Sequence, residues 1–370
     1  MTPVIVDAAR TPFGKRDGWL SGVHAAELLG HAQRGVLDRT GIDPALVEQA
    51  IGGCVTPIGE QFGNVTRTAW VHAGLPTATG TTTIDAQCGT AAQAVNLVAG
   101  QIAIGSLEVG LACGVELMSR VPLTYKVGTG LGTPRPESWS VDSPDQYTAA
   151  DRIAVRRGFS REDLDAFGLR SQQRAAAAWD AGLLDDQIIP VAGVTRDQGL
   201  RESSMEGLAR LQPVKDGGLH TAGSSSQISD GASAALLMSA ARAEELGLKP
   251  KARLLNQCVM GGDLAFMLDA PIEAAGRVLA RAGMTIADVD VFEVNEAFAS
   301  VPMSFAQVHG VEDDRLNPNG GAIAVGHPAG ATGIRLIATA LAELERRDAQ
   351  VALVAICASA ATTCLLIERL

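Results

Sequence analysis

Cys88 and His327 are the residues of this 370-residue chain whose surroundings best suit covalent chemistry. Cys88 stands in DAQCGTAAQAVNLVAG (85–100), directly before a glycine and a predicted helix of small residues. Unpaired N–H groups and the macrodipole at a helix N-terminus stabilise a thiolate over a thiol. Gly89 would let a substrate carbonyl approach, so that the Cys88 N–H could help form an oxyanion site. The alternative is a buried structural cysteine, which is common for this residue type.

His327 lies in GGAIAVGHPAGATG (320–333), where closely spaced glycines indicate that another group approaches the backbone. Pro328 keeps His327 out of helical conformation and starts the following helix. A neutral imidazole there could take a proton from a thiol, although a structural histidine in a turn is also possible. The segment lacks the GxGxxG spacing and the later acidic residue of a dinucleotide-binding fingerprint.

Three further segments carry groups that could assist such a pair. Cys357 follows the apolar run VALVAI and is either a core residue or a second thiol that exchanges protons with a carbon acid. Asn295 in VFEVNEAFAS (291–300) is either a helix cap or an amide that orients a water in an anion-binding pocket. HTAGSSSQISDG (220–231) is either a solvated loop or a segment whose hydroxyls and backbone hold a polar cofactor tail.

The elements that would position these residues alternate between strands and helices at both ends of the chain. Such alternation predicts right-handed crossovers and a largely parallel sheet covered on both faces. Strands are expected at 3–9, around 47–55, at 81–87 and at 107–118, with helices at 26–41 and after Cys88. From residue 230 the same plan resumes, with an extended lead, a small-residue turn, a helix, a buried strand and a cysteine at its end.

The middle of the chain differs in character and is predicted to be an insertion between two related halves. Residues 121–144 are rich in Gly, Pro and polar side chains, which favours a long loop. Residues 160–182 predict a helix with Ser160 as N-cap and Asp163 three positions on. We therefore expect an N-terminal half at 1–118 plus 229–249, a loop domain at 119–228 and a C-terminal half at 250–370.

Composition excludes several classes of function. The net charge is −11, and no Lys/Arg cluster exceeds the pairs at 156–157 and 346–347, so nucleic acid is not an expected partner. No run of about 18 apolar residues predicts a membrane span, and the start of the chain does not read as a signal peptide. The six cysteines form no CxxC pair, which favours reduced thiols in the cytoplasm and no metal site.

The order of these motifs resembles the thiolase family of CoA-dependent acyltransferases over essentially the whole chain. The combination of NEAFA with GGAIAVGHPAGATG is the most specific part of the match. WLSGVHAAELLG, RDQGLRESSM and HTAGSSSQISDGA look most like the degradative thiolases of steroid side-chain oxidation. The resemblance implies an α/β fold, a five-layered αβαβα sandwich of two duplicated halves, with the inserted loop domain covering the CoA site. It also implies a homodimer or homotetramer.

The resemblance also implies a role for each matching residue. Cys88 would be the acylated nucleophile, His327 its activator, and Cys357 the second acid/base. His327 and a water held by Asn295 would form one oxyanion hole, and the N–H groups of Cys88 and Ser359 the other. CoA would be a co-substrate, with no permanently bound cofactor. Contacts to CoA and the acyl chain would come from Ala222, Gly223, Ser226, Met267, Ala297 and Phe298.

The implied reaction is cleavage of a 3-ketoacyl-CoA by CoA to acetyl-CoA or propionyl-CoA and a shortened acyl-CoA, through an acyl-Cys88 intermediate. Two alternatives remain open: condensation to acetoacetyl-CoA, and acyl-CoA binding with impaired turnover. The second arises because the family usually has glycines after the second cysteine, whereas this chain has Cys357-Ala-Ser-Ala-Ala361. Gln87 and Ser224 also replace residues more frequent in the family.

Overall fold

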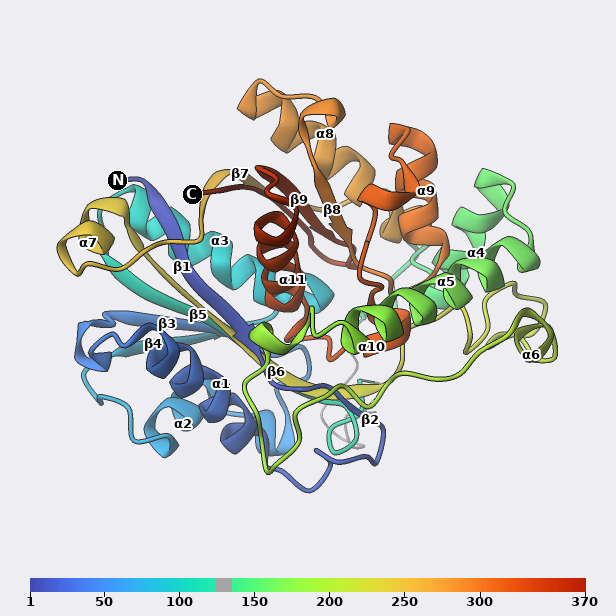
Figure 1. Cartoon of the computed structure of the whole chain (residues 1–370). Coiled ribbons are helices and arrows are strands. Elements are labelled where there is room, and N and C mark those ends of the chain that lie inside the picture. The colour runs from blue at the N-terminus through green and yellow to red at the C-terminus, as the bar shows by residue number, and fades with distance from the viewer. Residues whose placement is uncertain (124–134) are drawn as a thin grey trace.

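The computed structural model describes residues 1–123 and 135–370 (Figure 1). The part of the expected long loop at 124–134 lies outside these residues. Among the helices described, none combines the length and the apolar character needed to cross a bilayer.

One mixed sheet runs through the molecule in the order β4-β3-β5-β6-β1-β7-β10-β9-β8, with the short β2 paired to β6. Among the described residues, six of the nine strand pairings are antiparallel and three are parallel. The prediction of a largely parallel sheet was therefore wrong. The physical reason is that β10 turns back on β9 through a short loop, and that β6 returns from the inserted segment to run antiparallel to β5 and β1. The strands are β1 (Pro3–Arg10), β2 (Gly14–Lys15), β3 (Gln49–Gly53), β4 (Gly80–Ile84), β5 (Val109–Leu117), β6 (Ser229–Ser239), β7 (Ala252–Met260), β8 (Val291–Val294), β9 (Val351–Ile356) and β10 (Thr362–Arg369).

The two halves of the sheet follow the same plan. The first half has the order β4-β3-β5-β6-β1. In the second half, Leu316 bridges Phe292 of β8 in parallel, which extends the order to Leu316-β8-β9-β10-β7. When the short β2 is left aside, the third extended segment of each half, β4 or Leu316, forms the edge. The first segment of each half, β1 or β7, forms the opposite end. The halves join where β1 pairs with β7, through Val4–Arg253 and Ile5–Ala252.

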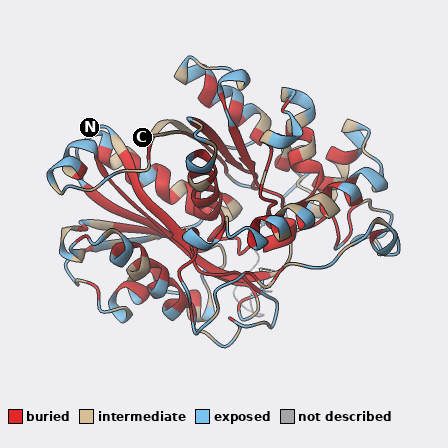
Figure 2. Ribbon diagram, viewed as in Figure 1, coloured by how far each residue is buried: buried red, intermediate tan, exposed pale blue. Residues whose placement is uncertain are grey.

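Helices divide the molecule into five layers (Figure 1). α1 and α2 pack on the outer face of the first half, while α8 and α9 cover the second. α3 and α11 lie between the two halves and contact strands of both, with a separate apolar core around them. Figure 2 shows these central helices and the strands beside them as mostly buried. The helices are α1 (Ala25–Thr40), α2 (Val65–His72), α3 (Thr90–Ala103), α4 (Gln146–Arg157), α5 (Arg161–Asp180), α6 (Met205–Ala209), α7 (Ala240–Glu245), α8 (Pro271–Ala282), α9 (Ser300–His309), α10 (Ala322–Val325) and α11 (Thr332–Arg347).

The small residues of α3 and α11 allow the backbones of the two central helices to lie in close contact. A Cβ atom added to Gly333 of α11 would lie 2.3 Å from the backbone nitrogen of Ala92 in α3. A Cβ on Gly114 of β5 would lie 2.0 Å from the carbonyl oxygen of Gly330. The two halves therefore meet at distances that only glycine permits, because packed interiors leave no space for an extra methyl group.

The inserted segment contains α4, α5 and α6. The predicted capping of α5 is confirmed: Ser160 accepts a hydrogen bond from the Asp163 N–H, and the Asp163 carboxylate accepts one from the Ser160 N–H. α4 was not predicted, because its buried face consists of Ala149, Ala150, Ile153 and Ala154, a narrow stripe of mostly small residues.

Candidate active site

Three of the proposed catalytic residues follow strands that belong to parallel pairs. Asn295 directly follows β8, Cys357 directly follows β9, and Cys88 comes shortly after β4. β8 pairs in parallel with β9, and β4 in parallel with β3. The carboxyl ends of parallel strands share one edge of a sheet, which is where α/β proteins commonly bind ligands.

One cavity of about 50 Å³ is lined by five of the eleven predicted site residues; Asn295 and Cys357 are not among its lining residues. Cys88 and His327 both line it, although they belong to different halves of the sheet. Ser226, Ala297 and Phe298 line the same cavity. The Ser226 N–H donates to the Ala297 carbonyl oxygen at 2.9 Å. The segment 220–231, here called the serine segment, and the segment 291–300 therefore form adjacent walls of the cavity.

Met267 and Ser359 line a neighbouring, more open cavity of about 360 Å³ instead. Ala222 and Gly223 line neither of these two cavities among the described residues. The Ala222 carbonyl oxygen accepts a hydrogen bond from Arg201, and the Gly223 carbonyl oxygen packs against Gly168 of α5. Ala222 and Gly223 therefore fix the serine segment to Arg201 and to α5, outside the two cavities.

Cys88 lies in a single 3-10 turn, η3 (Gln87–Gly89), that leads into α3. Burial and the nearby negative charge of Glu116 raise the pKa of the Cys88 thiol to about 12. The expected thiolate-favouring effect of the helix N-terminus is thus outweighed by desolvation, which disfavours the charged form. In the free protein Cys88 is a thiol, so its reaction requires a base.

His327 is arranged to be that base. Its Nδ1 lies 2.7 Å from the Thr332 hydroxyl, which itself donates to the Pro328 carbonyl oxygen at 2.9 Å. Because the hydroxyl proton is used in that bond, Nδ1 carries the proton and Nε2 keeps its lone pair. Burial, helped by the positive charge of Arg335, lowers the pKa of His327 to about 3. The imidazole is therefore neutral and can accept a proton.

Asn295 lies beside the free nitrogen of this ring. Its Nδ2 is 3.4 Å from His327 Nε2, and its backbone N–H donates to the Ala355 carbonyl oxygen at 2.9 Å. Its Oδ1 is buried and has no hydrogen-bond partner within residues 1–123 and 135–370. Buried polar atoms are normally satisfied, so this oxygen calls for a donor such as an ordered water.

Cys357 is fully buried next to Cys88. Burial is the main cause that raises the pKa of its thiol, and the Cys88 sulfur adds to the effect. A thiol with a raised pKa keeps its proton at neutral pH and can give it to a stronger base such as an enolate. Cys88 therefore lies close to both other groups, since it lines one cavity with His327 and its sulfur acts on the Cys357 thiol.

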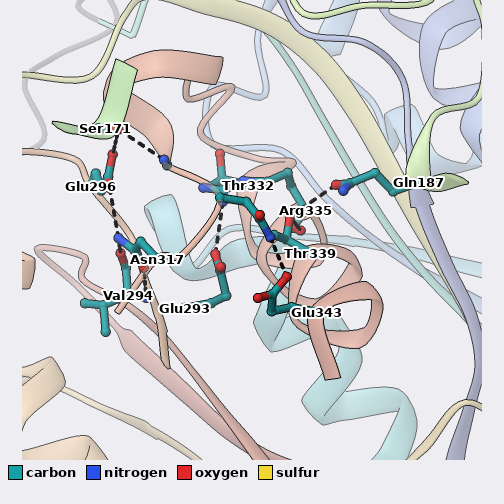
Figure 3. A network of polar contacts seen from close by, with 12 residues as sticks. Ser171, Gln187, Glu293, Val294, Glu296, Asn317, Thr332, Arg335, Thr339 and Glu343 are labelled. Carbon is teal, nitrogen blue, oxygen red and sulfur yellow. Dashed lines mark hydrogen bonds and ion pairs between the residues drawn. The ribbon is translucent and has the colours of Figure 1, made fainter. Parts of the chain in front are cut away.

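A network of buried polar side chains fixes the segments that carry Asn295 and His327 (Figure 3). The Glu296 carboxylate accepts hydrogen bonds from Ser171 of α5 at 2.5 Å and from Asn317 at 3.0 Å. The Ser171 hydroxyl also accepts from the Gly321 N–H at 3.1 Å, at the start of the histidine segment. α5 is thereby bonded directly to the segments that carry Asn295 and His327.

Glu116 at the end of β5 makes the corresponding link in the first half. Its carboxylate accepts hydrogen bonds from the N–H groups of Val55 at 2.8 Å, Thr56 at 3.1 Å and Gly330 at 3.1 Å, and from the Gln61 amide at 3.0 Å. Gly330 lies three residues after His327, so this carboxylate ties the histidine loop to the first half of the sheet. Burial raises the pKa of Glu116 to about 7 in spite of these donors.

Comparison with known proteins decides the family. Residues 3–241 match the thiolase N-terminal domain and residues 248–369 the thiolase C-terminal domain. The chain belongs to the thiolase family. Its resemblance to that family, stated from the motifs alone, is thus confirmed.

Relatives of this thiolase agree over nearly their full lengths. The steroid 3-ketoacyl-CoA thiolase FadA6 of Mycobacterium tuberculosis is 42% identical, with 99% of this chain and 94% of that protein covered. A 3-ketoacyl-CoA thiolase of Colwellia psychrerythraea is 39% identical, covering 96% and 95%. The crystal structure of the Bacillus anthracis acetyl-CoA acetyltransferase superposes with a TM-score of 0.92 at 30% identity, covering 100% and 99%. The predicted thiolase fold is therefore confirmed.

Sequence reasoning missed three supporting residues of this thiolase, namely Glu116, Thr332 and Arg335. Glu116 carried a signal, since it is a lone acidic residue within an apolar strand, where an unpaired charge is costly. Thr332 and Arg335 carried none, because the sequence of a helix start does not show which of its side chains will face the histidine in the preceding loop.

Proposed function

We propose that this thiolase cleaves 3-ketoacyl-CoA with CoA, through an acyl group held on Cys88. The observation that carries the proposal is the neutral thiol of Cys88 and the neutral imidazole of His327 lining one cavity, with the Cys357 thiol beside them. Cleavage of a carbon–carbon bond next to a ketone needs a soft nucleophile, a base for it and an acid for the departing enolate.

The first half of the reaction forms the acyl-enzyme. His327 Nε2 takes the proton of Cys88, and the sulfur attacks the C3 carbonyl of the substrate. The bond between C2 and C3 then breaks, leaving the acyl chain as a thioester on Cys88. The electron pair of that bond passes to the acetyl-CoA enolate, which takes its proton from Cys357.

The second half transfers the acyl group. The Cys357 thiolate takes the proton of the incoming CoA thiol, and the CoA sulfur attacks the acyl-Cys88 carbonyl. Collapse of the tetrahedral adduct expels the Cys88 sulfur, which recovers its proton from His327. The N–H groups of Cys88 and Ser359 are proposed to stabilise the oxyanion of this adduct, and the Asn295 water with His327 that of the enolate.

The substrate class follows from the relatives. The relatives include a steroid 3-ketoacyl-CoA thiolase and a 3-ketoacyl-CoA thiolase, which supports a degradative role in lipid or steroid side-chain β-oxidation. We further propose that the enzyme works in the cytoplasm as a homodimer or homotetramer, with CoA as co-substrate and no permanently bound cofactor.

A panel of short-chain, long-chain and steroid side-chain 3-ketoacyl-CoAs tests the proposal. Loss of the enolate absorbance on addition of CoA, with an acyl adduct on Cys88 in mass spectra, is the expected result. An adduct without turnover would instead identify an acyl-CoA-binding protein with impaired transfer. Absence of both would refute the proposed function.

A further inference from the structure

Gln87, the residue before the nucleophile, bonds to the turn that follows the second cysteine. Its Oε1 accepts hydrogen bonds from the Ser359 hydroxyl and from the Ala360 N–H, the latter at 3.1 Å. The two partners lie 272 and 273 positions further along the chain. This contact connects the loops of Cys88 and Cys357, one from each half.

The backbone of Gln87 is held in an unusual conformation. Its φ is +51°, in the left-handed region that non-glycine residues rarely enter. Its N–H donates to the Asp85 carboxylate at 2.7 Å, and its carbonyl oxygen accepts from the Thr90 hydroxyl at 2.5 Å. Such conformations persist only where neighbouring groups hold them, and they concentrate at functional sites.

The turn after Cys357 is supported by a side chain from the other half of the sheet. Residues 358–361 contain no glycine, and Ser359 and Ala360 have side chains that restrict the backbone. The Ser359 N–H makes no hydrogen bond in the described part of the chain. The Ser359 hydroxyl and the Ala360 N–H are both bonded to Gln87, so residues 359 and 360 are fixed while the Ser359 N–H stays free.

A second contact lies close by and shows how tightly the loops meet. The Thr363 hydroxyl donates to the Gly89 carbonyl oxygen at 3.3 Å. A Cβ on Gly89 would lie 2.6 Å from the Ala361 carbonyl oxygen. The Cys88 turn therefore has little freedom against the Cys357 turn, and Gln87 supplies the side-chain part of that constraint.

We infer that Gln87 is a positioning residue that holds the 357–361 turn, so that the Cys357 thiol and the Ser359 N–H face the acyl group on Cys88. The inference rests on the proposed function for its kinetic consequence and on the hydrogen bonds of Gln87 for its structural one. It also explains how the turn after Cys357 is held without glycines, because the Gln87 side chain from the other half bonds to Ser359 and Ala360.

The experiment compares Gln87→Met, which keeps the length but removes the acceptor, with Gln87→Glu, which keeps an acceptor oxygen. Gln101→Ala in α3 is the control, since the Gln101 side chain lies outside the site. Amide hydrogen exchange of the 357–361 peptide should be at least about 10-fold faster in Gln87→Met and unchanged in Gln87→Glu and Gln101→Ala, because the Ala360 N–H loses its partner only in the first.

Kinetics supply the second measurement. We expect Gln87→Met to lower kcat about 10- to 100-fold with little change in KM, because small displacements of catalytic groups cost this much. The Gln87→Met/Ser359→Ala double variant should be no slower than Gln87→Met alone, since both substitutions remove the same hydrogen bond between Gln87 and Ser359.

Unchanged exchange in Gln87→Met, or a double variant whose losses multiply, would overturn the inference. A wild-type protein that does not cleave 3-ketoacyl-CoA would instead refute the proposed function, and the exchange measurement would still decide whether Gln87 holds the turn.

Discussion

The Nδ1 atom of His327 and the hydroxyl of Thr332 lie 2.7 Å apart, five residues from one another across the start of α11. This contact selects the tautomer with a free Nε2 and orients the ring toward Cys88. A base that must accept a proton depends on such a partner as much as on its own pKa.

Thr332→Val should therefore lower kcat by at least about 10-fold, because the buried Nδ1–H loses its acceptor and the ring its orientation. The loss of a buried hydrogen bond should also reduce the free energy of unfolding by about 1–3 kcal/mol. Thr339→Val is the matched control, since Thr339 is buried on the same helix and its hydroxyl donates to the Arg335 carbonyl oxygen. Steady-state kinetics and urea unfolding separate the two effects. Equal loss of kcat in both variants would argue against a specific role for Thr332.

The pKa values of Cys88 and His327 predict how reactivity and stability depend on pH. With the pKa of Cys88 raised to about 12, its alkylation by iodoacetamide should keep accelerating through pH 9 without a plateau. With the pKa of His327 lowered to about 3, the ring is neutral when folded but gains a proton when unfolded below pH 6.5. Stability from this group is present above pH 6.5 and is lost as the pH falls toward 3.

Between pH 7 and pH 5 this loss amounts to about 2 kcal/mol, which His327→Asn should not show. Urea unfolding of both proteins at the two pH values measures the difference. An alkylation plateau below pH 8 would indicate a thiolate–imidazolium pair in the free enzyme and contradict the prediction.

Glu116→Gln tests the carboxylate that ties the histidine loop to β5. Removal of its negative charge lowers the pKa of Cys88, so alkylation at pH 8 should become faster. One of the two acceptor oxygens is lost, which should cost about 1–3 kcal/mol of stability.

The pKa of Glu116 is raised from 4.5 to about 7, so its contribution to stability is fully present below pH 4.5 and is lost as the pH rises through 7. The stability gap between wild type and Glu116→Gln should therefore narrow between pH 4.5 and 7 and stay constant above pH 7. Glu108→Gln, at the exposed start of the same strand, serves as control. Alkylation as slow as in the wild type would show that Glu116 does not act on the thiol.

Substitution of Cys88 and substitution of Cys357 should block different halves of the reaction. Cys88→Ala should take up no acyl label from 3-ketoacyl-CoA, whereas Cys357→Ala should label Cys88 slowly and lose about 10²- to 10⁴-fold in thiolysis. Mass spectrometry of the intact protein, with rapid quenching, distinguishes these outcomes. Acyl label on the Cys88→Ala protein, or normal turnover by Cys357→Ala, would remove the respective residue from its assigned role.

Gly333→Ala should separate α3 from α11, because the new methyl group would lie 2.3 Å from a backbone nitrogen. Overpacking of this kind typically costs about 1–3 kcal/mol, and here it would also move His327 relative to Cys88, so kcat should fall. Gly276→Ala in α8 is the control, since a Cβ there meets nothing within 4 Å. That change should leave kcat unaltered and stabilise the helix by about 0.5–1 kcal/mol. Thermal unfolding and kcat of both variants test this prediction. Full activity in Gly333→Ala would show that α3 and α11 can move apart without displacing His327 from Cys88.

Local patterns in the sequence account for much of the fold. Apolar periodicity located α1 and β5, and the Ser160–Asp163 pair located the start of α5, because each depends on neighbours within a few residues. Strand direction was not predictable in the same way. β6 returns after a long insertion, and nothing in its own residues distinguishes a parallel from an antiparallel partner.

The site divides along the same line. Cys88, Asn295 and His327 were recognisable because each lies in a short motif at a strand end or helix start. The contacts that tune them were not, since Gly330 meets Glu116 across 214 positions and Ser359 meets Gln87 across 272. Such pairs are determined by how the halves pack, which no spacing along the chain records.

The division of the catalytic groups between the halves has a consequence for biosynthesis. The ribosome makes the segment with Cys88 long before those with His327 and Cys357, which stand near the end of the chain. Until that last portion emerges and folds, the nucleophilic sulfur has neither its proton acceptor nor its companion thiol. Under the proposed mechanism, a polypeptide without His327 and Cys357 would lack both the base for acylation and the acid/base for acyl transfer.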